Sequence, residues 1–336
     1  MLRVAVDAMG GDYAPDEIVK GVITAVNKSK ELEVLLVGSE EKIRNSVDQK
    51  INSSRIHVIH TDEAIGNDED PGLAIRRKKK ASMVAAMQLV RSGEADAVVS
   101  AGNTGALMAG GLLFLGRING IKRPALLTVI PTFKGGGIVV LDVGANMDAK
   151  SDHMFQYALM GDIYASEVLG KVNPRIALLN IGSEENKGNH QVRASYALFE
   201  ESFNNFVGNV EAKELFQNMA DVLVCDGFVG NVLLKTIEGV SRDMFAFLKE
   251  EIKKDIKARV ASTMLLSVFK RVRNSLDDSE HGGALLIGVK GACIKCHGSS
   301  SARAISQALL KQVIPTVNNK TNEKIEEALR LSQLKG

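Results

Sequence analysis

The sequence predicts an α/β protein built on a parallel sheet that helices cover on both sides. Short apolar runs rich in Val, Ile and Leu recur along its 336 residues, and several are apolar on both faces, as buried parallel strands are. Helical patterns lie between many of these runs, and this alternation is typical of a doubly covered parallel sheet. Most runs end in Gly, Asp or Asn, so we expect ligands to bind beyond the carboxyl ends of the strands.

The individual elements follow from these runs in chain order. The apolar runs predict strands over residues 3–7, 33–38, 56–60, 95–100, 125–131, 138–144, 175–182, 220–227 and 284–288. Apolar residues at three- and four-residue spacing predict helices over residues 16–28, 82–92, 153–169 and 192–203, with a further helix near 324–331.

The segment 241–276 interrupts this alternation because it is helical throughout and contains no strand pattern. Apolar residues from Phe245 to Val272 recur at three- and four-residue steps and draw one stripe, while the other faces are basic and include Lys253 and Lys257. One interpretation is a helix or helical hairpin that packs on the body or on a second subunit. The other is a basic amphipathic surface that contacts an anionic membrane or an acidic protein.

Composition limits the classes of partner. Forty-two Lys and Arg against 40 Asp and Glu leave a net charge of +2, so attraction to an acidic partner must come from local patches. Trp is absent and aromatic residues make up 4%, which disfavours binding of single-stranded nucleic acid by stacking; we expect no nucleic-acid partner. The N-terminal residues show no signal-peptide pattern, and we expect a cytoplasmic protein.

The cysteines offer a metal or redox interpretation that we do not favour. Cys293, Cys296 and His297 match the spacing of covalent haem attachment, and the two cysteines also have the spacing of a redox pair. Haem attachment requires export, so two ordinary reduced cysteines are the preferred interpretation. No HExxH motif, paired CxxC motif or EF-hand loop is present, and no metal site is predicted.

Two glycine-containing loops follow predicted strands near the N-terminus. The first contains Asp7, then Gly10, Gly11 and Asp12, and its glycines would let backbone N–H groups approach an anion at the start of the next helix. Its two acids are suited to orienting other groups, and a purely structural turn is an equal alternative. The second loop, SAGNTGA, includes Asn103 and Thr104 and resembles an anion-binding loop without the GxxxxGK[ST] phosphate motif.

Three further loops place polar side chains beside glycines. Each has a structural turn as its alternative, and their joint occurrence is what indicates a site. Lys187 and Asn231 are suited to neutralising an anion or a developing oxyanion. The residues concerned are Gly182 and Lys187 after the seventh predicted strand, Gly230 and Asn231 after the eighth, and His297 and Ser299 near residue 300.

A run of five cations precedes the helix predicted at residue 82. It contains Arg76, Arg77, Lys78, Lys79 and Lys80 and follows an acidic stretch. Such runs are usually solvated, and the alternative is a docking site for an acidic partner or for phosphate.

Taken together, these motifs resemble the phosphate acyltransferase (PlsX) family. The resemblance runs from residue 4 to about residue 300 through AVDAMGGD-x-AP, RRKK, SAGNTGA, LDVGAN, NIG-x-E-x-x-KGN, GNVEA, DGF-x-GN and HGSS. Two positions depart from the family pattern: Tyr13 stands where a His is usual, and Cys296 where a small residue is usual.

The resemblance implies a fold, a reaction and partners. The fold would be a Rossmann-like, three-layer α/β/α sandwich of the phosphate acetyltransferase and isocitrate dehydrogenase type, here one catalytic domain over residues 1–336 with a helical excursion at about 241–276. The reaction would transfer a fatty acyl group from acyl carrier protein to inorganic phosphate, giving acyl phosphate for phospholipid synthesis. Members are cytoplasmic homodimers that associate peripherally with membranes through a helical projection.

We assign site residues by combining the motifs with the resemblance. Lys187, Asn231 and His297 are the expected catalytic residues, and Asp7 the orienting residue. The expected phosphate- or substrate-binding residues are Gly10, Gly11, Asp12, Asn103, Thr104, Gly182, Gly230 and Ser299. The expected carrier-protein-binding residues are Arg76, Arg77, Lys78, Lys79, Lys253 and Lys257.

No cofactor is expected, because phosphate is itself a nucleophile. The rival hypotheses on the same fold are a dehydrogenase and a non-catalytic anion-binding module. No GxGxxG fingerprint is present to support a common dinucleotide-binding enzyme.

Overall fold

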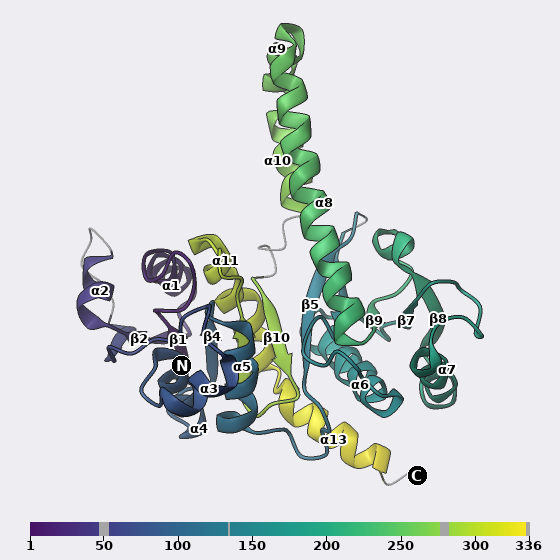
Figure 1. Ribbon diagram of the computed structural model, residues 1–336, viewed down its shortest axis with the longest axis horizontal. Coiled ribbons are helices and arrows are strands. Elements are labelled where there is room, and N and C mark those ends of the chain that lie inside the picture. The colour runs from purple at the N-terminus through teal and green to yellow at the C-terminus, as the bar shows by residue number, and fades with distance from the viewer. Residues whose placement is uncertain (47–53, 134, 276–281, 334–336) are drawn as a thin grey trace.

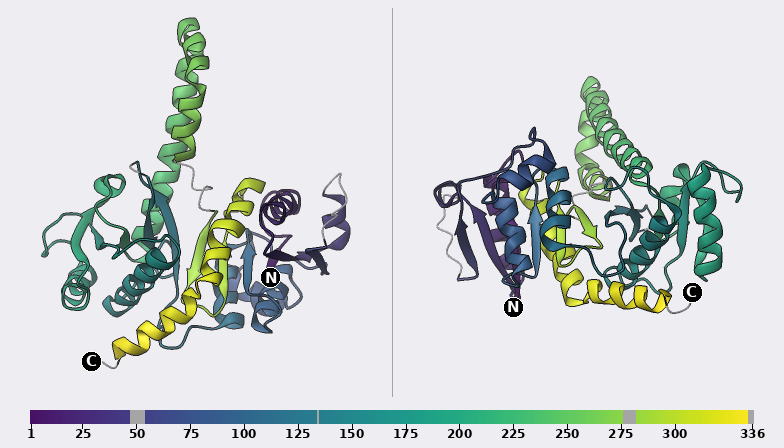
Figure 2. Two further views of the ribbon diagram at one scale, coloured as in Figure 1. Left: turned by 180° about the vertical axis from the view of Figure 1, so that it is seen from behind. Right: turned by 60° about the horizontal axis from the view of Figure 1, so that its bottom comes forward.

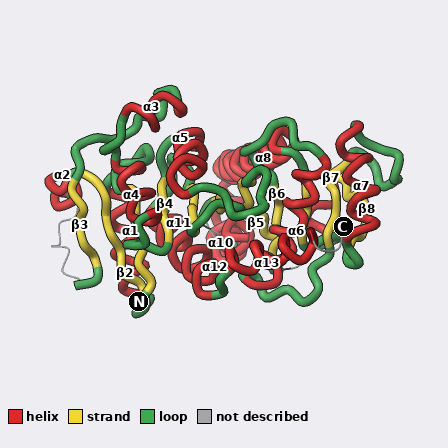
Figure 3. The backbone as a smooth tube through the Cα atoms, turned by 90° about the horizontal axis from the view of Figure 1, so that it is seen from below, coloured by secondary structure: helices red, strands yellow, loops and turns green. Residues whose placement is uncertain are grey.

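The structure, a computed structural model, describes residues 1–46, 54–133, 135–275 and 282–333. Its centre is a continuous eleven-stranded sheet with the order β3-β2-β1-β4-β11-β10-β5-β6-β9-β7-β8, and Figure 3 shows the strands side by side across the molecule. The strands are β1 Leu2–Asp7, β2 Leu32–Gly38, β3 Ile56–His60, β4 Ala97–Ser100, β5 Ala125–Pro131, β6 Gly137–Leu141, β7 Ile176–Asn180, β8 Phe206–Glu211, β9 Val222–Val224, β10 Ala284–Ile287 and β11 Ala292–Lys295.

The sheet consists of two parallel halves joined by antiparallel strands. Strands β3, β2, β1, β4 and β11 run parallel to one another, and so do β6, β9, β7 and β8. Strands β10 and β5 lie between the halves, and their pairings, with β11, with each other and with β6, are antiparallel. Parallel pairs predominate, so the prediction of a mostly parallel α/β fold is confirmed.

Helices cover both faces of this sheet, because alternate residues of each strand point to opposite sides. Helices α1, α6, α7, α11 and α13 bury their apolar faces in one core cluster, and α3, α4 and α5 do so in the other, which the base of α8 also covers. The helices are α1 Asp16–Lys28, α2 Glu40–Asn45, α3 Pro71–Arg77, α4 Ser82–Arg91, α5 Thr104–Gly110, α6 Ser151–Glu167, α7 His190–Ser202, α8 Gly227–Lys254, α9 Ile256–Met264, α10 Leu266–Ser275, α11 Ala302–Gln307, α12 Ile314–Asn318 and α13 Thr321–Gln333. Single turns of π-helix follow α5 and α11, at Gly111–Leu115 and Ala308–Val313, and a 3₁₀ turn spans Ala212–Gln217.

A helical hairpin stands away from the sandwich, as Figure 1 and both views in Figure 2 show. It is formed by α8, which rises from the sheet, and by α9 and α10, which turn back at its far end. The sequence predicts this excursion over residues 241–276, but α8 already begins at Gly227 on the sheet. The last predicted residue, Leu276, lies outside the described part of the chain.

Two strands are absent from the sequence prediction. Strand β8 contains Gly208, whose φ is +91°. Gly208 and the polar Asn209 that follows it interrupt the apolar pattern of the strand. Strand β11 is only four residues long and ends in a buried lysine, Lys295. Both are recognisable as strands only through their pairing with β7 and with β4. Within the described ranges, no helix is long and apolar enough to cross a membrane.

Candidate functional site

Polar residues gather at the carboxyl ends of β1, β4 and β11, which are neighbours in the sheet. Asp7 ends β1 and is 1% exposed; Ser100, which ends β4, is also 1% exposed. The Ser100 hydroxyl donates to Asp7 Oδ2 at 2.6 Å, and the Met9 amide donates to Asp7 Oδ1 at 3.2 Å. Burial raises the pKa of the Asp7 carboxyl, and these hydrogen bonds oppose that rise. Asp7 therefore joins two of the predicted loops, as expected of an orienting residue.

The glycine loop after β1 packs tightly against the loop after β4. A Cβ built on Gly10 would lie 2.7 Å from the backbone nitrogen of Gly102, so only glycine fits there. Gly11 has φ +112°, a conformation that other residues rarely adopt, and Asp12 N donates to the carbonyl of Gly298 at 2.8 Å. These glycines bring three loops together, and we keep phosphate binding by Gly10, Gly11 and Asp12 as a proposal.

Asn103 has a structural role in addition to the predicted role in binding phosphate or substrate. Its Oδ1 accepts from Ala106 N at 3.0 Å and caps α5, while its Nδ2 donates to the carbonyl oxygens of Asn67 at 3.0 Å and Glu69 at 3.3 Å. Both ends of the amide are thus engaged within the protein. Thr104, the next residue, is exposed at the same edge.

His297 and Ser299 form a small unit two residues beyond β11. The Ser299 amide donates to His297 Nδ1 at 3.2 Å, and the Ser299 hydroxyl lies 2.8 Å from the same nitrogen. Because Nδ1 accepts the backbone N–H, the neutral ring carries its proton on Nε2. The exposed imidazole can therefore donate a hydrogen bond from Nε2. The Ser301 hydroxyl accepts from Ala304 N and caps the next helix, α11.

A second polar group lies at the carboxyl end of β6, around a residue that the sequence analysis did not single out. The buried carboxylate of Asp142 accepts from the backbone amides of Leu126, Gly144, Ala145 and Asn146 at 2.7–3.1 Å. Burial raises the pKa of this carboxyl, and the hydrogen bonds oppose the rise. Asp142 thereby fixes the loop at residues 142–146, and the first turn of α8 packs against this loop.

The start of α8 is fitted closely to that loop. Asp226 caps the helix by accepting from Val229 N at 2.8 Å, and Gly227 N donates to the carbonyl of Asn146 at 2.8 Å. A Cβ built on Gly230 would overlap the carbonyl oxygen of Asp142. Gly230 is therefore required for close packing, and it places the next residue, Asn231, against Gly144.

Lys187 lies in the loop after β7, the strand beside β9. The Asn180 amide donates to the carbonyl of Lys187 at 3.1 Å and closes this loop. The Lys187 side chain is 48% exposed, and its Nζ lies 3.8 Å from Glu184 Oε1. Gly182 is buried beside it, where a Cβ would lie 3.0 Å from Lys187 Cγ. Because β7 and β9 are parallel neighbours, the Lys187 loop and the start of α8 emerge at the same edge.

Helix α8 connects the two polar groups. Asn231 and Lys235 are four residues apart on α8 and share one face of the helix. Lys235 is close enough to Lys295, at the end of β11, to lower the pKa of Lys295 electrostatically. Three successive antiparallel pairings separate β11 from β6, so the carboxyl ends of the two halves of the sheet point in opposite directions. Asn231 therefore belongs to the second group, and only Lys235 acts electrostatically on the first. Among the residues described, no hydrogen bond or ion pair joins Lys187 to Asp7, Ser100 or Lys295.

The six predicted carrier-binding cations do not form one surface. Arg76, Arg77 and Lys79 are exposed at the end of α3 on the body. Lys78 differs, because its ammonium bonds internally to the carbonyl of Ala64 at 2.9 Å and to Glu69 at 2.7 Å. The other two predicted cations lie on the hairpin, away from α3 (Figure 1): Lys253, which pairs with Glu250, and Lys257.

The cysteine pattern carries no metal or redox chemistry. Cys293 and Cys296 are free and buried, and burial raises the pKa of each thiol to about 12. Cys293 belongs to one core cluster and Cys296 to the other, so the two thiols point to opposite faces of the sheet. The haem and redox-pair interpretations are therefore wrong. In the described ranges, no group of His, Cys, Asp and Glu is arranged to hold a metal ion.

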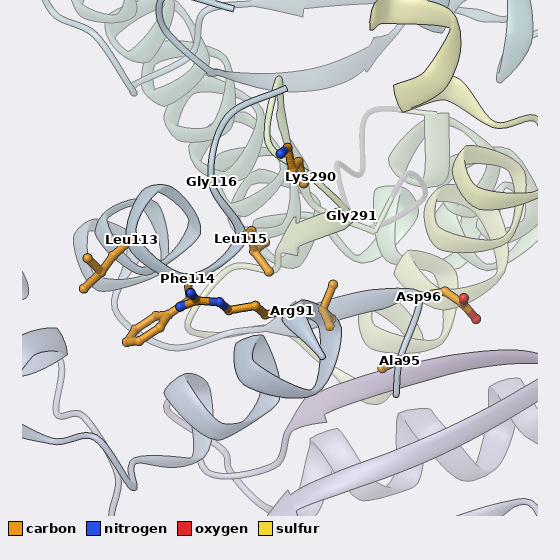
Figure 4. A pocket seen from close by; sticks show the side chains of 10 residues that line it. Arg91, Ala95, Asp96, Leu113, Phe114, Leu115, Gly116, Lys290 and Gly291 are labelled. Atoms are coloured by element: carbon orange, nitrogen blue, oxygen red, sulfur yellow. The ribbon is translucent and has the colours of Figure 1, made fainter. Parts of the chain in front are cut away.

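A pocket of about 440 Å³ lies elsewhere, at the amino-terminal ends of β4 and β11. Figure 4 shows it between Arg91, Phe114, Asp96 and Lys290. It contains none of the predicted site residues and lies at the edge of the sheet opposite to Asp7 and Ser100.

Two residues of the site were missed from the sequence. Asp142 was visible within the LDVGAN motif as an acid directly after an apolar run, the same signal that identified Asp7. Lys295 lies between two cysteines, and nothing in its sequence context marks it as buried. Only the pairing of β11 with β4 places it beside Ser100.

Comparisons with known proteins show the family of the chain. Residues 2–324 match the family model described as fatty acid synthesis protein. A phosphate acyltransferase of Bacillus cereus is 47% identical over 325 residues, covering 95% of this chain and 98% of the relative. A phosphate acyltransferase of Bacillus thuringiensis is 46% identical with the same coverage.

Solved structures with little sequence similarity share the fold. A phosphotransacetylase from Streptococcus pyogenes superimposes with a TM-score of 0.60 at 14% identity, over 96% of this chain and 94% of that one. A branched-chain phosphotransacylase from Enterococcus faecalis V583 gives a TM-score of 0.57 at 15% identity, over 94% and 99%. The family model and the similarity to curated relatives extend over nearly the whole chain. The chain therefore belongs to the fatty acid synthesis protein family, in which these relatives are phosphate acyltransferases.

Proposed function

We propose that this enzyme transfers a fatty acyl group from acyl carrier protein to inorganic phosphate and so supplies acyl phosphate for phospholipid synthesis. The observation that carries the proposal is the identity of 47% to a phosphate acyltransferase over 95% of the chain. The site motifs lie within the matched residues, and their loops gather at the carboxyl ends of strands in both halves of the sheet.

The proposed reaction uses groups that this chain holds in place. A phosphate oxygen attacks the thioester carbonyl carbon and forms a tetrahedral intermediate with a negatively charged oxygen. The Lys187 ammonium and the Asn231 amide stabilise that oxygen. The carbon–sulfur bond then breaks, acyl phosphate is released, and the imidazolium form of His297 gives its Nε2 proton to the thiolate. The proton that hydrogen phosphate loses on attack restores the imidazolium. Thr104 and Ser299 contact the phosphate in this scheme, and Asp7 holds the loops that carry them.

Two features support an acidic carrier as the acyl donor. Arg76, Arg77 and Lys79 are exposed together at the end of α3 and just after it, and α3 packs beside α5, which follows the Asn103 loop. A carrier bound there would lie next to the proposed reaction centre. The electrostatic attraction would guide the encounter and weaken as salt screens it.

The hairpin supports association with a membrane surface or a second subunit. Ile256, Val260, Met264 and Leu266 are exposed along α9 and α10, and their exposed fractions are 62–82%. Apolar residues beside cations suit the interface of an anionic bilayer, where each nearby cation contributes about 1 kcal/mol. We propose weak, reversible peripheral binding to a membrane through α9 and α10. A second subunit would cover the exposed apolar residues nearer the base of α8 in a homodimer.

One assay tests the enzymatic proposal. Purified protein is incubated with acyl-carrier-protein thioester and phosphate, and acyl phosphate is trapped with hydroxylamine. We expect hydroxamate that depends on both substrates. A carrier that binds without phosphate-dependent product would indicate a binding module, and a nicotinamide-dependent absorbance change would indicate a dehydrogenase; either result contradicts the proposal.

A further inference from the structure

Asp7, Ser100 and Lys295 form a buried lateral row across three neighbouring strands. The register of β1 with β4 brings Asp7 beside Ser100, and Ser100 pairs with Lys295 in the register of β4 with β11. Each lies two residues after a side chain of the same core cluster, so the three side chains point to one face of the sheet. Their exposed fractions are 1%, 1% and 8%.

The ammonium group of Lys295 is only partly satisfied in this row. It has three N–H donors, and within the described part of the chain it makes one hydrogen bond, to the carbonyl oxygen of Cys296. Among the described residues, no carboxylate forms an ion pair with it, and the Asp7 carboxylate already accepts from Ser100 and Met9. A buried charge without a counter-ion is costly, and a bound anion would supply the counter-charge here.

The charges around Lys295 leave the position open to an anion. Burial is the largest influence and lowers the pKa of the Lys295 ammonium, and Lys235 lowers it further, while Cys296, Asp12 and Asp7 act in the opposite direction. Asp12 is already engaged by the Asn67 amide at 3.1 Å. Two cations, one from each half of the sheet, are thus close enough to repel each other. A dianion between them would relieve both that repulsion and the lost hydration of the buried ammonium.

We propose that Lys295 binds inorganic phosphate and holds it in place for attack on the thioester. This inference rests on the proposed acyl transfer to phosphate and adds a binding residue to it. Lys295 lies two residues before His297, and Lys235 lies one helical turn after Asn231. Phosphate bound at Lys295 would therefore lie beside the loop that carries the proposed proton donor, His297. Lys235 is the outer of the two, because its side chain is 54% exposed and also pairs with Glu238.

The test compares Lys295, the last residue of β11, with Lys290, which lies two residues before that strand. Lys295→Met keeps the length of the side chain and removes its charge. Lys290→Met is the matched control, because Lys290 is exposed at the amino-terminal side of β11. Binding of inorganic phosphate is measured by calorimetry and by ³¹P line broadening on the intact protein. The KM for phosphate and the KM for the acyl donor are then measured separately, and denaturant unfolding confirms that each variant is folded.

We expect Lys295→Met to weaken phosphate binding and to raise the KM for phosphate by at least about tenfold, the usual effect of losing one charged hydrogen bond. The KM for the acyl donor should stay within about twofold, and Lys290→Met should match the wild type. Unchanged phosphate affinity in folded Lys295→Met overturns the proposal, and so does an equal rise in both KM values.

A second variant covers the case in which Lys295→Met does not fold. Lys295→Gln keeps a donor toward the Cys296 carbonyl while removing the charge, and phosphate affinity equal to that of the wild type would again overturn the proposal. The direct titration also separates the two claims. A wild-type protein that binds phosphate through Lys295 but forms no acyl phosphate would refute the proposed function alone.

Discussion

At the scale of single residues, Lys187 offers the sharpest test of the reaction centre. Its ammonium is half exposed and lies 3.8 Å from Glu184 Oε1, an arrangement that contributes little to stability. Lys187→Ala should therefore lower kcat by on the order of 10²–10³, as loss of one oxyanion donor does, without changing the free energy of unfolding. Lys213→Ala is the control, since Lys213 is 70% exposed and also pairs with a glutamate. Full turnover in folded Lys187→Ala would remove this residue from the mechanism.

The buried carboxyl of Asp7 should make stability depend on pH in a definite direction. Burial raises its pKa in the folded protein, so the folded state holds this proton more tightly than the unfolded state does. The contribution of Asp7 is then fully present below the unfolded pKa and is lost as the pH rises through the folded pKa.

We therefore expect Asp7→Asn, which stays neutral, to lose this dependence. The difference in unfolding free energy between wild type and Asp7→Asn should shift in favour of the wild type as the pH falls from 7 toward 4. The slope should be at most about 1.4 kcal/mol per pH unit, the value for one proton. Chemical unfolding at several pH values measures it, and parallel curves for the two proteins would contradict the assignment.

At the scale of elements, helix α8 contains a matched pair of glycines. A Cβ on Gly230 would overlap the carbonyl of Asp142, whereas a Cβ on Gly239 would meet nothing within 4 Å. Gly230→Ala should cost about 1–3 kcal/mol of stability by forcing α8 away from its loop, and should lower activity by displacing Asn231. Gly239→Ala should be neutral or stabilising by up to about 1 kcal/mol, because alanine favours the helix. Thermal and denaturant unfolding measure both changes; equal effects would show that the close approach is unimportant.

The basic end of α3 should be the carrier's contact on the body. We expect Arg77→Glu with Lys79→Glu to raise the KM for acyl carrier protein by about tenfold and to reduce its dependence on salt, with kcat retained. The hairpin variant Lys253→Glu with Lys257→Glu should have a smaller effect, because that segment stands away from the site loops (Figure 1). Carrier kinetics over a range of salt concentrations decide between the two surfaces, and a larger effect from the hairpin pair would reverse the assignment.

At the scale of the whole molecule, the hairpin tip predicts binding to anionic membranes. Ile256 and Val260 are 76% and 65% exposed in the first turns of α9, next to the far end of α8. Glutamate at both positions should abolish flotation with anionic vesicles and leave activity on a dispersed acyl donor unchanged. Val172→Glu is the control, because Val172 is 95% exposed on the body. Sedimentation confirms that the oligomeric state is unchanged; equal flotation of all three proteins would show that the tip is not the membrane contact.

The parts of the fold that depend on local pattern were predictable from the sequence. Strands 56–60 and 125–131 and helix 16–28 have the predicted bounds, because an apolar run or stripe between polar ends is a local signal. Most other elements agree to within a few residues. Strands β8 and β11 were missed, since a positive-φ glycine in one and a terminal lysine in the other conceal their apolar faces.

The candidate site likewise has features that the sequence predicts and features that only the tertiary structure shows. The sequence by itself determined the fold class, the family resemblance and the loops that end its strands, because residue spacing and motif order are properties of the chain. Only the tertiary structure showed that Asn103 is fully bonded within the protein, that Gly230 is a packing residue and that Lys295 is buried beside Ser100. Strand register and helix packing decide which distant residues meet and which donors stay free, and neither is encoded in the pattern of one segment.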